Sequence, residues 1–229
     1  PGPGGMEDCR KLAGARDTGH PPVSGQRRPR QHLRRGRAAD LCQAGAGEQR
    51  RYAYDPEHPS QHIIDMSENE IEVPEDYTQE ELRQDLLCYT SPVLEEDLVL
   101  TGDMTAELYI SSDAPDTDFV VRVTDVDENG RSIKLADGLL SARYRNGFAR
   151  SEFLQEGEIV CLKIRTTKLS NCFRKGHRIR VTVTSSAKNF IFPNSNIREG
   201  FASARTVVAH NRVYHGGLHA SRLTVRVEP

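Results

Sequence analysis

Apolar and polar residues alternate with a period of two along most of the chain after Asp85, which is the pattern of strands that bury one face. The stretch MTAELYI is typical, because Met104, Ala106, Leu108 and Ile110 are apolar and their neighbours are mostly polar. Each such run is close to the length of an average strand, about 5–6 residues. In chain order, the runs that predict strands are DLLCYTS, DLVLTG, MTAELYI, FVVRVTD, GLLSARYR, IVCLKIR, RIRVTVT, RTVVAHNRVYH and RLTVRV.

Turn residues separate these predicted strands, and no run of helical periodicity lies between them. The clearest turn is DENGRS, where Asn129-Gly130 tolerates the positive φ of a tight hairpin. The absence of crossover helices excludes a parallel α/β sheet. The sequence therefore predicts an all-β sandwich over residues 82–229, with two sheets closing over one core. One short helical turn is expected before it, in YTQEELRQ with Thr78 as the N-cap.

The first 51 residues differ in composition from the rest of the chain. They contain no aromatic residue and no Ile, and they carry 11 basic against 5 acidic residues, which leaves 20 basic and 28 acidic residues for the remainder. Burial of this small apolar surface cannot offset the conformational entropy that is lost on folding. We therefore expect residues 1–51 to be disordered, or to be a misread or truncated segment. Residues 52–81 contain Pro56, Pro59 and Pro74 and are expected to form an extended acidic linker.

Composition also argues against several kinds of partner. The basic head lacks the interleaved aromatic residues that stack on bases, so no nucleic acid is expected. No apolar run reaches the ~18 residues of a membrane span, so no membrane is expected either. The chain begins without a signal-peptide pattern, and its cysteines form neither a C-x-x-C pair nor a dense disulfide framework. These features predict a cytoplasmic protein without a bound cofactor; the cysteines are Cys9, Cys42, Cys88, Cys161 and Cys172.

The sequence shows no covalent catalyst. The nucleophile turn of an α/β-hydrolase requires G-x-S-x-G, whereas the only G-x-S here is Gly130-Arg131-Ser132, and Lys134 stands where the second Gly should be. That serine also lies in a predicted hairpin. No cysteine has a partner histidine nearby in the sequence.

The histidines are interpreted as structural residues. His210, His215 and His219 in HNRVYHGGLH have spacings that suit neither one face of a strand nor a helical zinc motif, so we place them on the surface and in turns. His177 begins a strand after Gly176 and is interpreted as a hydrogen-bonded packing residue rather than a base.

The stretch SSDAPDTDF brings together three carboxylates, those of Asp113, Asp116 and Asp118. They could turn the chain, since Asp side chains accept hydrogen bonds from nearby backbone N–H groups and Pro115 presets φ. They could also bind calcium, although no Gly-containing loop with regularly spaced acids supports this. Turn formation is favoured, calcium stays open, and the sequence assigns no catalytic, cofactor-binding or metal-binding residue.

Longer segments of the chain resemble a known family. RQDLLCYTSPVLEEDLVLTGDMTAELYISSDAPDTDFVVRVTDVDENGRSIKLADGLLSARYR is followed in the same order by TTKLSNCFRKGHRIRVTVTSS, NFIFPNSN and YHGGLHASRLTVRV. Together they are similar to the carboxy-terminal domain of the cocaine esterase and Xaa-Pro dipeptidyl-peptidase group of serine hydrolases, from about residue 52 to residue 229. The resemblance implies a jelly-roll, galactose-binding-like β-sandwich. It also places Asp116 and Asp118 in a loop of the sandwich and not in a catalytic triad.

The function that this resemblance implies is that of a non-catalytic domain. It would pack on an upstream α/β-hydrolase domain that carries the Ser-Asp-His triad and cleaves acyl esters or Xaa-Pro peptides, and alone it would be inactive. Whether it forms a homo-oligomer stays open. The alternative is a free-standing jelly-roll module that binds carbohydrate or another ligand, against which stands the absence of Trp.

The chain departs from the family pattern in two places. The family usually continues N-x-N with Thr-Gly, but here Asn194-Ser195-Asn196 is followed by Ile197-Arg198, which puts the geometry of that loop in question. In addition, residues 1–51 show no resemblance to the closing segments of a hydrolase domain.

Overall fold

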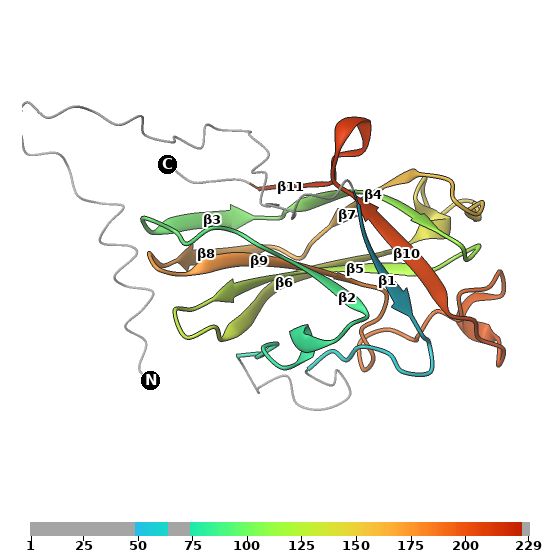
Figure 1. The fold of residues 1–229 in the computed structure, drawn as a ribbon, viewed down its shortest axis with the longest axis horizontal. Coiled ribbons are helices and arrows are strands. Elements are labelled where there is room, and N and C mark those ends of the chain that lie inside the picture. The colour runs from blue at the N-terminus through green and yellow to red at the C-terminus, as the bar shows by residue number, and fades with distance from the viewer. Residues whose placement is uncertain (1–48, 64–73, 226–229) are drawn as a thin grey trace, which may run out of the picture. The chain divides into compact units, whose positions relative to one another are not determined.

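The computed structural model describes residues 49–63 and 74–225, and within these residues it contains strands and short 3-10 turns but no α-helix (Figure 1). The prediction of an all-β sandwich is confirmed. The expected disorder of residues 1–51 lies outside the described residues, except for its last three.

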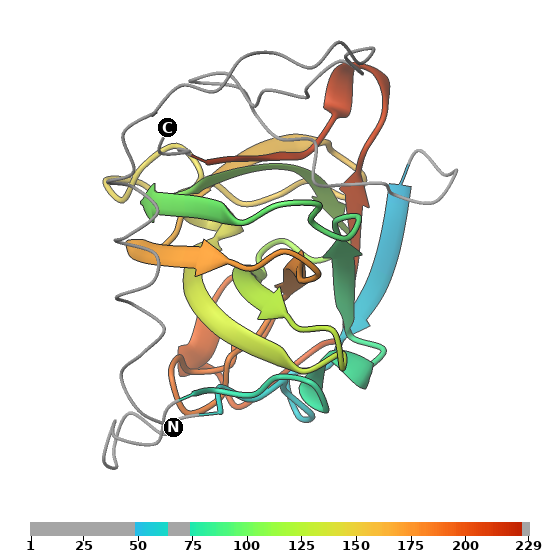
Figure 2. The same cartoon turned by 90° about the vertical axis from the view of Figure 1, so that its left-hand side faces the viewer.

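Two antiparallel sheets form the sandwich, and a separate two-stranded sheet extends it (Figures 1 and 2). The first sheet has the strand order β1-β10-β4-β11, with β7 also paired to β4. Its strands are β1 (Gln49–Tyr54), β4 (Thr105–Ser112), β7 (Val160–Arg165), β10 (Ala209–Tyr214) and β11 (Arg222–Thr224).

The second sheet has the order β2-β9-β5-β6, and the remaining pair is β3 with β8. The strands of the second sheet are β2 (Leu86–Thr90), β5 (Asp118–Val126), β6 (Ser132–Ser141) and β9 (Arg178–Thr184). The separate pair consists of β3 (Leu98–Gly102) and β8 (Leu169–Phe173). The 3-10 turns are η1 (Glu80–Leu82), η2 (Ala142–Tyr144), η3 (Gly200–Ala202) and η4 (Gly217–His219).

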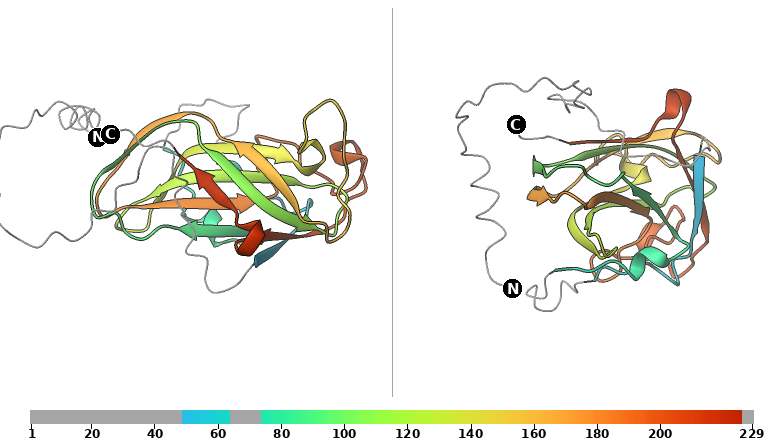
Figure 3. Two further views of the ribbon diagram at one scale, coloured as in Figure 1. Left: turned by 90° about the horizontal axis from the view of Figure 1, so that it is seen from above. Right: turned by 60° about the vertical axis from the view of Figure 1, so that its left-hand side comes forward.

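The core lies between the two sheets, whose strands face each other across it in the views of Figure 3. Alternate residues of each strand enter this core, as the period-two pattern requires. In β4, for example, Ala106, Leu108 and Ile110 are at most 5% exposed. Large side chains from other strands join them, including Tyr54 of β1 and Phe173 of β8, which are fully buried.

The sandwich begins earlier in the sequence than the pattern predicted. Residues from 52 onwards were expected to form a linker, but β1 pairs with β10 in antiparallel register from Gln49↔Tyr214 to Tyr54↔Ala209. Tyr52 and Tyr54 point into the core and are at most 5% exposed. The flanking arginines and the prolines that follow obscure this short alternation in the sequence.

Residues 55–63 and 74–85, which we call the strap, also belong to the folded domain rather than to a free linker. Tyr77 N–H donates to Ser132 O at 2.8 Å, and Lys134 N–H donates to Glu75 O at 3.0 Å, so the strap runs along β6. The guanidinium of Arg122 on β5 lies 3.8 Å from the centroid of the Tyr77 ring. The strap therefore covers a face of the second sheet.

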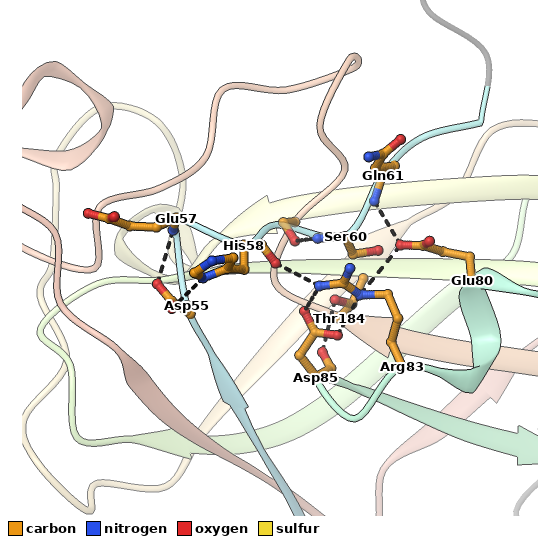
Figure 4. A network of polar contacts seen from close by, with 10 residues as sticks. Asp55, Glu57, His58, Ser60, Gln61, Glu80, Arg83, Asp85 and Thr184 are labelled. Carbon is orange, nitrogen blue, oxygen red and sulfur yellow. Dashed lines mark hydrogen bonds and ion pairs between the residues drawn. The ribbon is translucent and has the colours of Figure 1, made fainter.

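Charged side chains hold the two parts of the strap together (Figure 4). Arg83 donates to both carboxylate oxygens of Asp85 at 2.7 Å and to His58 O at 2.6 Å. Glu80 accepts the backbone N–H of Gln61 at 2.9 Å. Asp85 O in turn accepts the hydroxyl of Thr184 on β9 at 3.1 Å, which ties the strap to the sheet.

Of two local predictions for this region, the N-cap is wrong and the hairpin is confirmed. Thr78 does not cap the 3-10 turn η1, whose N-cap is Gln79 without a side-chain hydrogen bond. The Thr78 hydroxyl instead donates to Asp76 at 2.5 Å and accepts the N–H of Ser132 at 2.9 Å, because β6 lies alongside. The predicted hairpin between β5 and β6 is present, and Gly130 has the positive φ, at 84°.

Three buried tyrosines are expected to make the protein unfold cooperatively in alkaline solution. Burial raises the pKa of the Tyr52, Tyr54 and Tyr77 phenols above their ordinary value of about 10. A raised folded-state pKa means that stability is fully present below the unfolded pKa and falls as the pH rises above it. We expect these phenols to ionise only as the protein unfolds, seen as tyrosinate absorbance at 295 nm rising together with loss of the far-ultraviolet circular dichroism.

Tyr54→Phe is a suitable control for this titration. The Tyr54 hydroxyl is buried and has no hydrogen-bond partner in the described part of the chain, so its removal should not lower stability at neutral pH. It should shift alkaline unfolding to higher pH. Ionisation of all tyrosines with an unchanged circular dichroism spectrum would contradict the prediction.

Candidate functional site

The three carboxylates of SSDAPDTDF do not gather in one place. Asp113 is exposed and accepts two hydrogen bonds from His210 on β10, from its backbone N–H and its Nδ1–H, both at 2.7 Å. Asp116 and Asp118 point the other way and are at most 7% exposed. Asp113 therefore joins the β4–β5 loop to β10, while the other two carboxylates serve a different region.

Asp116 is the centre of a buried polar network. One of its oxygens accepts the backbone N–H of Arg143 at 2.9 Å, and the other accepts Arg143 Nε–H at 2.7 Å. The side-chain amide of Asn194 then bridges the two acids, donating to Asp116 at 2.7 Å and to Asp118 at 2.9 Å. The network links three segments that are far apart in the sequence.

Burial raises the pKa of the Asp118 carboxyl, and hydrogen bonds from Ser141 and Asn194 oppose this shift. The nearby Asp116 carboxylate adds to the increase, whereas Arg143 opposes it. Burial thus makes loss of the Asp118 proton less favourable than it is in water.

The predicted turn-forming role of these acids is correct for the segment but not for the individual residues. The local turn uses Ser112, whose hydroxyl accepts the N–H of Ala114 at 3.1 Å. The acids instead bind distant loops. Among the described residues, no group of three or more His, Cys, Asp or Glu side chains is placed to hold a metal ion.

The network organises two long loops at the right-hand end of the sandwich in Figure 1, residues 142–159 between β6 and β7 and residues 185–208 between β9 and β10. We call this region the loop end. Arg143 also donates to Ile197 O at 3.1 Å, which connects the two loops directly. Arg143 and Arg198 both lie over the ring of Phe153, at 5.0 and 4.5 Å from its centroid.

The loop that departs from the family pattern is well anchored. Asn196 adopts a left-handed φ of 62°, which asparagine tolerates better than most residues. Its backbone N–H donates to the Asn194 side chain at 2.9 Å, and its own amide donates to Val207 O at 2.7 Å. Arg198, in place of the usual glycine, supplies the contact with Phe153.

Three phenylalanines of the loop end are exposed. Phe148 is 80% exposed in the first loop, and Phe192 and Phe201 are 79% and 71% exposed in the second, where their rings stack at 5.9 Å. These three residues were not identified as candidates from the sequence. Their position in long loops between turn residues was the available signal. Contiguous exposed apolar patches, such as the stacked pair Phe192 and Phe201, often mark surfaces that contact another molecule.

The serine of the G-x-S sequence and the serines beside the Asp113–His210 pair are engaged in other hydrogen bonds. Ser132, from the G-x-S sequence, is fully buried at the start of β6, and its hydroxyl donates to Glu81 at 2.9 Å and lies 2.8 Å from the Thr124 hydroxyl. Near the Asp113–His210 pair, the hydroxyl of Ser111 is bonded to Tyr214 and that of Ser112 to Ala114. The carboxylate and imidazole thus form a pair without an attached nucleophile.

The remaining histidines lie apart from one another. His215 Nε2 is 3.0 Å from the Tyr89 hydroxyl, and burial lowers the pKa of this imidazole. His219 packs edge-on against Tyr109. His177 Nδ1 is 2.9 Å from Asp125, as expected of a hydrogen-bonded packing residue.

Comparison with known proteins identifies relatives that are much longer. A family model described as the X-Pro dipeptidyl-peptidase C-terminal non-catalytic domain matches residues 16–224, and thus begins within the segment in which the sequence analysis found no resemblance. Cocaine esterase from Rhodococcus sp. (strain MB1 Bresler) is 35% identical over 183 residues, which cover 77% of this chain and 32% of the esterase. The chain therefore spans about a third of the length of this relative.

Solved structures share the fold. An alpha-amino acid ester hydrolase has a TM-score of 0.75 at 22% identity, covering 81% of this chain and 33% of its own. An aminopeptidase from a marine sediment archaeon, Thaumarchaeota archaeon, has a TM-score of 0.73 at 23% identity, with coverage of 79% and 33%. Within the described residues, no helix is long and apolar enough to span a membrane.

Proposed function

Because the chain belongs to the family of X-Pro dipeptidyl-peptidase C-terminal non-catalytic domains, we propose that it serves a serine hydrolase as the domain that packs on the catalytic domain and helps to shape its active site. The partner would be an α/β-hydrolase domain that cleaves acyl esters or Xaa-Pro peptides. Its serine would attack the substrate carbonyl, and its oxyanion hole would hold the developing charge. The family match favours this function over a free-standing carbohydrate-binding module.

The observation that carries the proposal is the pair of exposed aromatic loops at the loop end. Burial of one exposed phenylalanine stabilises a complex by about 1.5–3 kcal/mol, so Phe148, Phe192 and Phe201 together offer a substantial docking energy. The network of Asp116, Arg143 and Asn194 beneath them holds the loops in one arrangement. Two thirds of the length of the esterase relative lies outside the matched region, which is ample for a catalytic domain.

A chimeric enzyme tests the docking surface. Residues 49–225 would replace the matching third of the Rhodococcus cocaine esterase, and hydrolysis of p-nitrophenyl acetate would be measured. We expect the chimera to be active, and the Phe192→Ser/Phe201→Ser variant to lose about tenfold or more in kcat/KM, because two anchors of the interface are removed. Leu218→Ser is the matched control, since Leu218 is 91% exposed but lies in η4, outside the loop end.

The 229-residue chain alone should not hydrolyse the same ester. Turnover by the chain that a serine-directed phosphonate abolishes would contradict the non-catalytic role. Equal losses from the Leu218 and Phe192/Phe201 variants would contradict the choice of surface. A cytoplasmic location is part of the same proposal, and it is supported by the described cysteines Cys88, Cys161 and Cys172, which are free thiols.

A further inference from the structure

A hollow of about 660 Å³ lies over the first sheet, and its lining residues include none of the three loop-end phenylalanines. Its floor crosses three neighbouring strands, β1, β10 and β4, and the loop that precedes β7 contributes Glu156 and Gly157 to its wall. A volume of this size is in the range of small-molecule sites, about 300–1,000 Å³. The hollow is therefore large enough for a metabolite-sized ligand.

Two arginines stand directly opposite each other in this hollow. Arg51 on β1 and Arg212 on β10 are register partners, and both are exposed. Side chains paired in this way have Cβ atoms about 4.5–5.5 Å apart, and like charges in such positions destabilise a sheet. Within the described part of the chain, neither guanidinium makes a hydrogen bond, an ion pair or a ring contact.

The other cationic side chains exposed on this sheet have carboxylate partners. Arg165 Nε lies 2.6 Å from Asp103, and both Lys163 and Arg222 form ion pairs with Glu107. The unpaired state of Arg51 and Arg212 is therefore not a general feature of this sheet. It is confined to the hollow.

The remaining polar groups of the hollow are acceptors, which suit donor groups on the same ligand. Asp113 accepts the backbone N–H and Nδ1–H of His210, which use two of the about four acceptor sites of its carboxylate. In the tautomer that donates Nδ1–H, His210 Nε2 is an acceptor as well. Glu156 lines the wall but forms no ion pair with either arginine, and it would accept a hydrogen bond from a ligand hydroxyl or ammonium group.

We propose that the hollow around Arg51 and Arg212 is a binding site for a small-molecule oxyanion, a carboxylate or a phosphate, held between the two guanidinium groups. Guanidinium groups bind such oxyanions through paired, charge-assisted hydrogen bonds. A bound oxyanion would also offset the repulsion between the two arginines. This inference does not depend on the proposed role in a serine hydrolase.

The test uses side-chain Nε–Hε signals of the arginines in two-dimensional ¹H–¹⁵N spectra of the 229-residue chain. Inorganic phosphate and acetate would be titrated separately at low ionic strength, with sodium chloride at matched ionic strength as the reference. We expect the Arg51 and Arg212 signals to shift in a saturable way, and Arg51→Gln or Arg212→Gln to weaken binding by about tenfold or more. Saturation by phosphate alone, or by acetate alone, identifies which oxyanion the site takes.

Arg165→Gln is the matched control, because Arg165 is exposed on the same sheet but has its own partner in Asp103. It should change the affinity by less than twofold, and circular dichroism would verify that each variant is folded. The proposal is overturned if sodium chloride produces the same shifts. It is equally overturned if the Arg165 variant weakens binding as much as the Arg51 and Arg212 variants, or if neither anion saturates the signals.

Discussion

Asp116→Ala should lower the free energy of unfolding by about 3–5 kcal/mol, the usual cost of removing one partner from a buried ion pair. Asp116 is fully buried, and the side chain of Arg143 is only 13% exposed. Without the carboxylate, the Arg143 guanidinium and the Asn194 amide would each lose one acceptor at a site where both side chains are largely buried. Urea denaturation followed by circular dichroism measures the change.

Asp113→Ala is the matched control for this prediction. It removes a carboxylate three residues away in the same loop, but the side chains of Asp113 and His210 are 40% and 67% exposed. An exposed pair of this kind contributes below about 1 kcal/mol. An equal decrease in the free energy of unfolding for the two variants would contradict the central role of Asp116. Other contacts would then have to hold the two loops of the loop end together.

The period-two alternation of apolar and polar residues was sufficient to predict the β-sandwich, because it indicates which face of each strand is buried. It was insufficient where a strand is short or carries little alternation. The strand β1 was missed because only Tyr52 and Tyr54 mark its buried face, between arginines and prolines. The strand β8 was missed because LSNCF carries little alternation and pairs only with β3.

The sites were harder to predict than the fold, since their meaning depends on contacts between distant segments. Residue type alone could suggest a calcium site at Asp116, but the partners that decide its role, Arg143 and Asn194, lie 27 and 78 residues further along the chain. Likewise, nothing in the sequence shows that Arg51 faces Arg212. That pairing follows from the register of β1 on β10.

Glu81→Ala should also be strongly destabilising, by about 3 kcal/mol or more, because Glu81 is the buried anchor of the strap. One of its oxygens lies 2.5 Å from Arg180 Nη1 on β9, and the other accepts the hydroxyl of Ser132 on β6 at 2.9 Å. The substitution removes the carboxylate that accepts from Arg180 Nη1 and from the Ser132 hydroxyl, although Ser132 keeps its contact with Thr124 and Arg180 Nε keeps its bond to Thr90. It also frees η1 from the sheet, so amide hydrogen exchange at Tyr77 and Glu81 should accelerate more than in the core strand β5.

Glu80→Ala separates this anchoring role from a general effect of removing an acid from η1. Glu80 lies 3.5 Å from Arg83, but Arg83 keeps its bidentate bond to Asp85 and its bond to His58 O when Glu80 is removed. The control should therefore lose only about 1 kcal/mol. If Glu81→Ala lost no more than this, the strap would be held by its backbone bonds to β6. In that case the strap would resemble the extended linker that the sequence predicted, and not an anchored part of the sandwich.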